Sequence, residues 1–171
     1  MTVSTVSLFL ALLALVAQAG TVALVAVRGR ARRALAAAVG PHALGLAFAV
    51  AAVATLGSLY FSGVAHFPPC RLCWYQRIAM YPLVPVLGLA AWRRDRGIRP
   101  YAALLAGPGA VVSAYHVLVE RFPTLESGAC DPTNPCSLIW VSRFGYLTIP
   151  AMALTAFLLI LALLRAEGDQ S

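Results

Sequence analysis

The sequence predicts an all-α integral membrane protein, a four-helix transmembrane bundle with one extra transmembrane helix at its N-terminus. The first observation is composition, since 61% of the 171 residues are hydrophobic and only 11% are charged, whereas an average soluble domain has about 25% charged residues. The second is a mean hydropathy of +0.82. The third is the presence of several uncharged runs close to the ~20 apolar residues that a span needs. An ordinary soluble domain and a disordered chain are therefore excluded.

Five spans follow from these runs. Their interiors are rich in Ala, Leu, Val and Gly, as expected of helices packed in lipid, and lack the polar–apolar alternation of a membrane β-barrel. The predicted spans cover about residues 4–27, 40–63, 72–91, 101–119 and 145–164. We divide the chain into residues 1–33, which form the extra helix and an Arg-rich cytoplasmic loop, and residues 34–171, which form the four-helix membrane domain.

The first span is interpreted as a retained helix with its N-terminus outside the cell. A cleaved signal peptide is the alternative, because Ala17-Gln18-Ala19 resembles a signal-peptidase site. However, no basic residue precedes the apolar run and an Arg cluster follows it, which reverses the charge order of a signal peptide.

The third span is short. Its uncharged run, residues 78–92, would reach about 22 Å as a helix, less than a hydrocarbon core of ~30 Å. The helix must therefore begin near residues 71–73, which places Arg77 one to two turns inside the membrane boundary.

Charge and cysteine placement predict the orientation. All 13 basic residues are Arg, and the net charge is +7. Nine of them fall on one side of five spans, which the positive-inside rule makes cytoplasmic, together with the C-terminus. These nine are Arg28, Arg30, Arg32, Arg33, Arg93, Arg94, Arg96, Arg99 and Arg165. The four cysteines, Cys70, Cys73, Cys130 and Cys136, lie at or near the other side, which is the oxidising side of a bacterial cell membrane.

Cys70 and Cys73 follow two prolines that suit a helix start, so we place both in the first turn of the third span. Free N–H groups and the helix dipole stabilise a thiolate there, and Arg71 and Arg77 add positive charge. Cys70, Cys73 and Arg77 would share one stripe of the helix. The pattern indicates a reactive pair. A structural disulfide would close almost no loop, and a zinc site shared with Cys130 and Cys136 would need unusual spacing.

Cys130 and Cys136 lie in the outer loop, residues 120–143, where Pro132 and Pro135 forbid a regular helix. A disulfide across this short ring would stabilise the fold by only ~2.4 kcal/mol, and an exposed disulfide is open to exchange. A plain loop staple is the alternative.

Two pairs on one face suggest a relay in which electrons enter at the exposed pair and leave through the membrane-edge pair. Residues 137–144 are expected to lie in the headgroup region, unless they simply begin the fifth span.

A relay that ends at the lipid boundary needs a lipid-soluble acceptor, and a quinone fits. Arg77 is a suitable donor to its oxygens. His116 in the fourth span is a second candidate, and a helix-end histidine bonded to a neighbour is an equal alternative for it. The sequence has neither a haem-attachment motif nor a dinucleotide fingerprint.

Several motifs together resemble the DsbB family, and within it the BdbC branch of disulfide formation proteins. The resemblance covers about residues 40–165. The matching motifs are Pro69-Cys70-x-x-Cys73-Trp74-Tyr75-Gln76-Arg77-Ile78 with Met80-Tyr81-Pro82, Tyr115-His116, Cys130 with Pro135-Cys136-Ser137, and Phe144-Gly145-Tyr146-Leu147-Thr148-Ile149-Pro150.

The resemblance implies a bundle that reoxidises an extracytoplasmic thioredoxin-like disulfide oxidase of the DsbA/BdbD type. Such a protein passes the electrons to menaquinone or ubiquinone and so supports oxidative protein folding.

By position, the Cys70–Cys73 redox disulfide matches the quinone-proximal pair, with Cys73 as the charge-transfer partner, and Arg77 matches the quinone-site arginine. The Cys130–Cys136 disulfide matches the pair that exchanges with the partner protein, with Cys130 favoured for attack. The first span is extra to the family core, and the second pair is closer together than in the best-studied DsbB type.

Three other interpretations stay open. One is a membrane metal-binding protein using four cysteine thiolates, and another is a structural subunit stapled by disulfides. The third is a vitamin K epoxide type of reductase, although Trp74-Tyr75-Gln76-Arg77 favours the first family. The leading interpretation assigns no residue to a metal and no nucleic-acid partner.

Overall fold

The structure is a computed structural model that describes residues 2–27, 29–126, 130–131 and 133–168. Its long helices are α1 (Val3–Ala26), α2 (Gly29–Val39), α3 (Ala43–Gly63), α4 (Arg71–Arg93), α5 (Arg99–Arg121) and α6 (Ile149–Gly168). Short 3-10 turns are η1 (Gly40–His42), η2 (Arg96–Ile98) and η3 (Pro123–Leu125), and a small antiparallel hairpin consists of β1 (Ser142–Arg143) and β2 (Leu147–Thr148).

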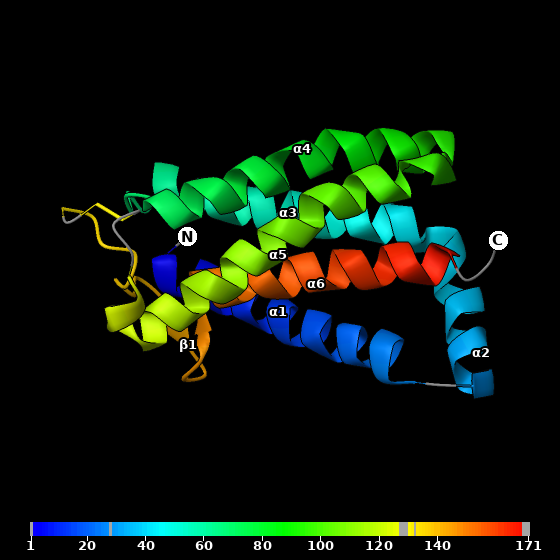
Figure 1. Ribbon diagram of the computed structural model, residues 1–171, viewed down its shortest axis with the longest axis horizontal. Coiled ribbons are helices and arrows are strands. Elements are labelled where there is room, and N and C mark those ends of the chain that lie inside the picture. The colour runs from blue at the N-terminus through cyan, green and yellow to red at the C-terminus, as the bar shows by residue number, and fades with distance from the viewer. Residues whose placement is uncertain (1, 28, 127–129, 132, 169–171) are drawn as a thin grey trace.

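Helices α3 to α6 form the bundle, in which α3 packs on α4 and α6, and α5 packs on α4 and α6 (Figure 1). Helix α1 runs along α6 on the outside of this bundle, and α2 lies across one end. The start of α1, the α3–α4 link and the described part of the segment between α5 and α6 gather at one end of the molecule, whereas the end of α6 and the α4–α5 turn lie at the other. The predicted fold class is confirmed.

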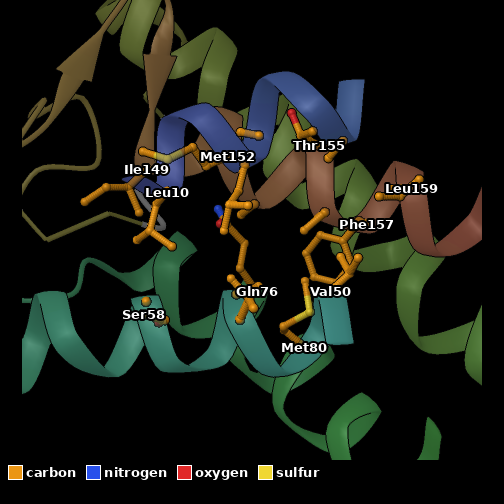
Figure 2. Close-up of a pocket in the computed structure, with 18 of the residues that line it drawn as sticks. Leu10, Val50, Ser58, Gln76, Met80, Ile149, Met152, Thr155, Phe157 and Leu159 are labelled. Atoms are coloured by element: carbon orange, nitrogen blue, oxygen red, sulfur yellow. The ribbon is translucent and has the colours of Figure 1, made fainter. Parts of the chain in front are cut away.

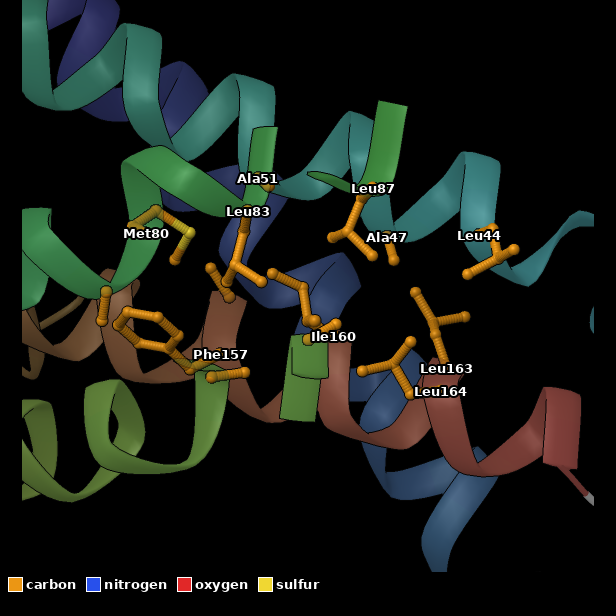
Figure 3. Packing of buried hydrophobic residues seen from close by; sticks show 14 of the residues in the cluster. Leu44, Ala47, Ala51, Met80, Leu83, Leu87, Phe157, Ile160, Leu163 and Leu164 are labelled. Carbon is orange, nitrogen blue, oxygen red and sulfur yellow. The ribbon is translucent and has the colours of Figure 1, made fainter. Parts of the chain in front are cut away.

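The core of the bundle combines large apolar side chains with alanines (Figure 3). Leu83 and Leu87 of α4 and Phe157 and Ile160 of α6 are fully buried against them. Gly109 of α5 lies against Phe157, and a Cβ atom at this position would come within 2.4 Å of the ring. Small residues thus let the helices approach closely, as is common where lipid surrounds a bundle.

Among the residues that the structure describes, four helical stretches are long and apolar enough to cross a bilayer: Val3–Ala26, Gly29–Gly63, Arg96–Arg121 and Ile149–Gly168. Helix α4 is less apolar because Arg71, Gln76 and Arg77 occupy its first half. Its 23 residues nevertheless reach about 34 Å, enough for a hydrocarbon core of ~30 Å. Its start at Arg71 agrees with the early start that the short third span required.

Two sequence predictions of local structure are wrong, the start of the fifth span and the loop after the first span. The fifth span begins at Ile149 rather than near residue 145, because Phe144 and Gly145, at φ values of 52° and 76°, form the turn of the β1–β2 hairpin. Residues 137–144 are therefore not the start of that helix. The Arg-rich segment after α1 is the helix α2 rather than a loop, which its Arg and Ala residues favour.

Candidate redox site

Cys70 and Cys73 lie at the start of α4, after the extended Pro68-Pro69 segment. Cys70 is the N-cap, a correction to its predicted place in the first turn, and its sulfur accepts a hydrogen bond from the backbone N–H of Cys73 at 3.4 Å. Both cysteines are free thiols, and their sulfur atoms are 3.0 Å apart. The structure therefore holds this pair in its reduced form, and formation of the predicted Cys70–Cys73 disulfide stays a prediction.

The surroundings of Cys70 favour a thiolate. The hydrogen bond with the Cys73 thiol lowers the pKa of Cys70 far below its usual value, and although burial opposes this shift, the hydrogen bond and charge of His116 add to it. The backbone N–H of Cys73 contributes in the same direction, as expected at a helix N-terminus. Cys70 is thus suited to act as a nucleophile or as a leaving group in thiol–disulfide exchange.

His116 of α5 connects the two cysteine pairs. The side-chain amide nitrogen of Gln76 lies 2.9 Å from Nδ1 of His116, and Nε2 carries the hydrogen that faces the Cys136 carbonyl. That Nε2 lies 2.9 Å from the carbonyl oxygen of Cys136 and 3.7 Å from the sulfur of Cys70. The imidazole is almost completely buried. His116 therefore contacts Cys70 directly and the second pair through the backbone of Cys136.

Cys130 and Cys136 form a disulfide in the outer loop, with their Cα atoms 5.9 Å apart. Cys136 is buried and packs in one cluster with Cys70, whereas Cys130 is half-buried at the edge of that cluster. Pro132 and residues 127–129 of the predicted loop lie outside the described residues. The predicted pairing is present, and its two cysteines differ in burial.

Glu126 holds the second pair in position. One carboxylate oxygen accepts a hydrogen bond from the backbone N–H of Cys136 at 2.6 Å, and the other accepts one from the Ser137 hydroxyl at 2.9 Å. Further along, Trp140 stacks on Phe67 with ring centroids 4.9 Å apart. The loop is thereby fixed over the start of α4.

Arg77 lies one turn below Cys73 and turns towards α3. Its Nε donates to the Ser58 hydroxyl at 3.0 Å and its Nη2 to the Ser58 carbonyl at 3.2 Å. The guanidinium also lies 5.2 Å from the centre of the Trp74 ring, within the range of a cation–π contact. Arg77 is therefore anchored between two helices rather than extended freely to the surface.

A cavity of about 540 Å³ lies between α1, α3, α4 and α6 (Figure 2). This volume falls within the ~300–1,000 Å³ of typical small-molecule sites. Cys73, Gln76, Arg77 and Ser58 line one part of the cavity, and most of its remaining wall is apolar. Cys73 and Arg77 thus share a stripe as predicted, but Cys70 is not among the lining residues.

His116 also lies outside this cavity. With Cys70, Cys73 and Glu120 it lines a separate space of about 30 Å³. The structure accordingly brings His116 to the thiols, and a direct contact between His116 and a quinone remains a prediction.

A metal site made of four cysteine thiolates does not fit this structure, because the sulfurs of Cys130 and Cys136 are bonded to each other. A three-residue set remains at Cys70, Cys73 and His116, whose ligand atoms lie within 4.8 Å of one another.

Three residues of the site had no role in the sequence prediction. Gln76 lies inside the cysteine motif, one turn after Cys73, so its position on the helix could have indicated a role. Ser58 of α3 and Glu126 of the loop act through contacts between distant parts of the chain, for which the sequence carried no local signal.

The family model described as "Disulfide bond formation protein DsbB" matches residues 40–165. The chain is 44% identical over 125 residues to "Disulfide bond formation protein C" of Bacillus subtilis, covering 71% of this chain and 91% of that protein. It is 43% identical over 125 residues to a "Probable disulfide formation protein" of Oceanobacillus iheyensis, covering 70% and 86%. It is also 43% identical over 121 residues to a protein with the same description from Coxiella burnetii, covering 70% and 82%. No solved structure matches the chain.

Proposed function

Because this chain belongs to the DsbB family of disulfide bond formation proteins and is a multi-pass membrane thiol-disulfide oxidoreductase, we propose that it reoxidises an extracytoplasmic thioredoxin-like oxidase of the DsbA/BdbD type. We further propose that the electrons pass to a membrane quinone. The observation that carries the proposal is the arrangement at His116, where the Cys70 thiol and the backbone of Cys136 meet the same imidazole nitrogen.

The relay consists of two thiol–disulfide exchanges. In the first, a thiolate of the reduced partner attacks a sulfur of the Cys130–Cys136 disulfide, and a mixed disulfide resolves to leave the partner oxidised and this pair as two thiols. Cys130 is the proposed point of attack, because Cys136 is buried.

In the second exchange, the loop dithiol reduces the Cys70–Cys73 disulfide. One S–S bond breaks, one forms, and two electrons and two protons move from the loop pair to the membrane-edge pair.

The cavity next to Cys73 suits a quinone. A bound quinone would accept two electrons and two protons from the thiol pair, which would return Cys70 and Cys73 to a disulfide. Arg77 would hold a quinone oxygen through its fixed charge and planar set of donors. The apolar remainder of the cavity would exclude water from the exchange.

Both cysteine pairs are proposed to lie on the extracytoplasmic side, with the C-terminus in the cytoplasm. The support is that the arginines assigned above to the cytoplasm, as far as the structure describes them, lie at the end of the bundle opposite the cysteines (Figure 1). The positive-inside rule requires this arrangement. A membrane-impermeant thiol reagent, applied to intact cells after reduction, should label Cys130. Labelling only after the membrane is opened would contradict this orientation.

The decisive experiment for the function supplies purified protein with a reduced thioredoxin-like partner and a quinone. We expect quinone reduction that Cys70→Ser and Cys73→Ser abolish while both variants still insert in the membrane. Normal turnover in either variant would refute the relay.

The metal-binding alternative rests on the Cys70, Cys73 and His116 set. Stoichiometric zinc in the purified protein, with thiols that do not react, would favour that alternative.

A further inference from the structure

We propose that α1, which precedes the region shared with the family, forms one wall of the quinone site and contacts the isoprenoid tail of the quinone. This inference rests on the function proposed above and deepens it. The family match begins at residue 40, so the proposed tail contacts are a property of this chain's added segment.

The first observation is that one face of α1 lines the cavity. Leu10, Leu13, Ala14, Ala17, Gly20 and Leu24 are all among the lining residues. Together with Val16 and Ala23, which also line the cavity, they form one broad stripe along the helix. From Leu10 to Leu24 this stripe extends over about 21 Å of helix axis, which suits an elongated apolar chain better than a ring alone.

The second observation is that polar contacts fix α1 in this position. Gln18 donates to the Thr155 hydroxyl of α6 at 3.2 Å and accepts from the Tyr146 hydroxyl at 2.8 Å. Arg143 of the hairpin donates to the Ser7 hydroxyl at 2.8 Å and to the Ser4 carbonyl at 3.1 Å. In an apolar surrounding such bonds define how a helix is rotated against its neighbours.

The third observation is that α3 accommodates α1 at the cavity. Gly57 faces Leu10, and a Cβ atom at position 57 would lie 2.9 Å from a methyl group of that leucine. Figure 2 shows Leu10 of α1 and Met152 of α6 directed into the cavity from one side and Val50 of α3 from the other. Helices α1, α3 and α6 thus line the cavity together.

The chemistry of the wall identifies the ligand class. Cys73 and Arg77 provide a polar, reactive part of the cavity, and α1 contributes only aliphatic side chains and one glycine to its lining. A molecule with a polar head that reacts at Cys73 and a long hydrocarbon tail fits both parts. A tail along α1 would gain packing contacts with these aliphatic side chains, which are the main source of affinity for a ligand that is already dissolved in lipid.

The test compares two tryptophan substitutions two residues apart on α1. Ala17 lines the cavity, whereas Ala19 is exposed and does not. We expect Ala17→Trp to raise the KM for a long-tailed quinone by about tenfold or more, with little change for a short-tailed quinone. Ala19→Trp should leave both values unchanged. Exchange of the Cys130–Cys136 pair with the partner serves as the folding control for both variants.

A second measurement keeps this inference separate from the proposed function. A quinone with a photoactivatable group at the end of its tail should label peptides of α1 in the wild-type protein, whether or not it is reduced. Absence of quinone reduction by the wild type would refute the proposed function. Labelling confined to other helices, or an equal effect of Ala17→Trp on long- and short-tailed quinones, would overturn the role of α1.

Discussion

The Nε2 atom of His116 lies 3.7 Å from the sulfur of Cys70, and the same nitrogen lies 2.9 Å from the backbone oxygen of Cys136. Gln76 fixes the imidazole from its other side. One buried side chain therefore holds the thiol of one pair and the backbone of the other. This arrangement suits electron transfer between pairs, because exchange requires the thiolate and the disulfide sulfur to approach in a defined geometry.

We predict that His116→Ala slows exchange between the two pairs by at least about tenfold, since a hydrogen-bonding acid or base typically contributes 10²–10⁴-fold. The rate is measured as appearance of free thiols at Cys70 and Cys73 after reduction of the loop pair. His42→Ala is the matched control, because His42 is exposed and lies in η1. An unchanged exchange rate, with a lower affinity for quinone instead, would assign His116 to the quinone.

The lowered pKa of Cys70 predicts the pH dependence of the reduced protein. A lowered pKa means that the thiolate is present at neutral pH and is lost only as the pH falls through the lowered value. An ordinary thiol with a pKa of about 8.5 would be almost fully protonated at about pH 6. The ultraviolet thiolate absorbance of the reduced protein should therefore persist at that pH, disappear in Cys70→Ser, and titrate at higher pH in His116→Ala. A titration near the ordinary thiol value would contradict the assigned environment of Cys70.

The membrane fold and the membrane-edge pair could be predicted because their signals are local. Hydropathy located four of the long helices to within about three residues. The spacing of Cys70, Cys73 and Arg77 follows from the period of one helix, and the structure retains Cys73 and Arg77 along one cavity wall.

The rest of the site depends on contacts between segments that are distant in sequence. Ser58 is 19 residues from Arg77, and Gln18 is 137 residues from Thr155. Helical periodicity indicates which face is apolar but not which neighbour a polar side chain meets. For the same reason His116 had two equal interpretations. The second half of the hairpin was assigned to the fifth span because the uncharged run that starts at Phe144 continues without a break into α6.

The difference in exposure between Cys130 and Cys136 predicts which one the partner attacks. We expect Cys136→Ser to leave Cys130 able to trap a mixed disulfide with the partner, seen as a covalent adduct on a non-reducing gel. Cys130→Ser should trap far less, because Cys136 is buried. An adduct that forms with Cys130→Ser and not with Cys136→Ser would reverse the assignment.

The two hydrogen bonds that Glu126 accepts should stabilise the loop that carries the second cysteine pair. Glu126→Ala removes the acceptors for both the Cys136 N–H and the Ser137 hydroxyl, and an unpaired buried donor costs about 1–3 kcal/mol. We expect a lower melting temperature and a faster reduction of the Cys130–Cys136 disulfide by a small dithiol. Ser137→Ala removes only one of the two bonds and should have a smaller effect. Equal behaviour of Glu126→Ala and the wild type would show that other contacts hold the loop.

Substitutions at Arg77 and Ser58 distinguish two contributions to quinone binding, namely the positive charge of the guanidinium and the position in which that charge is held. Arg77→Ala should insert normally and keep the Cys130–Cys136 pair exchangeable, but raise the apparent KM for quinone, because it removes the fixed donors beside Cys73. Arg77→Lys should recover only part of the affinity, since a point charge does not reproduce a planar set of donors. Ser58→Ala keeps the charge but removes the hydroxyl that orients it, so its KM should lie between those of the wild type and Arg77→Ala. Arg93→Ala is the control, because Arg93 is exposed at the other end of α4. If Arg77→Ala leaves the quinone kinetics unchanged in an intact protein, the guanidinium serves only to join α3 to α4.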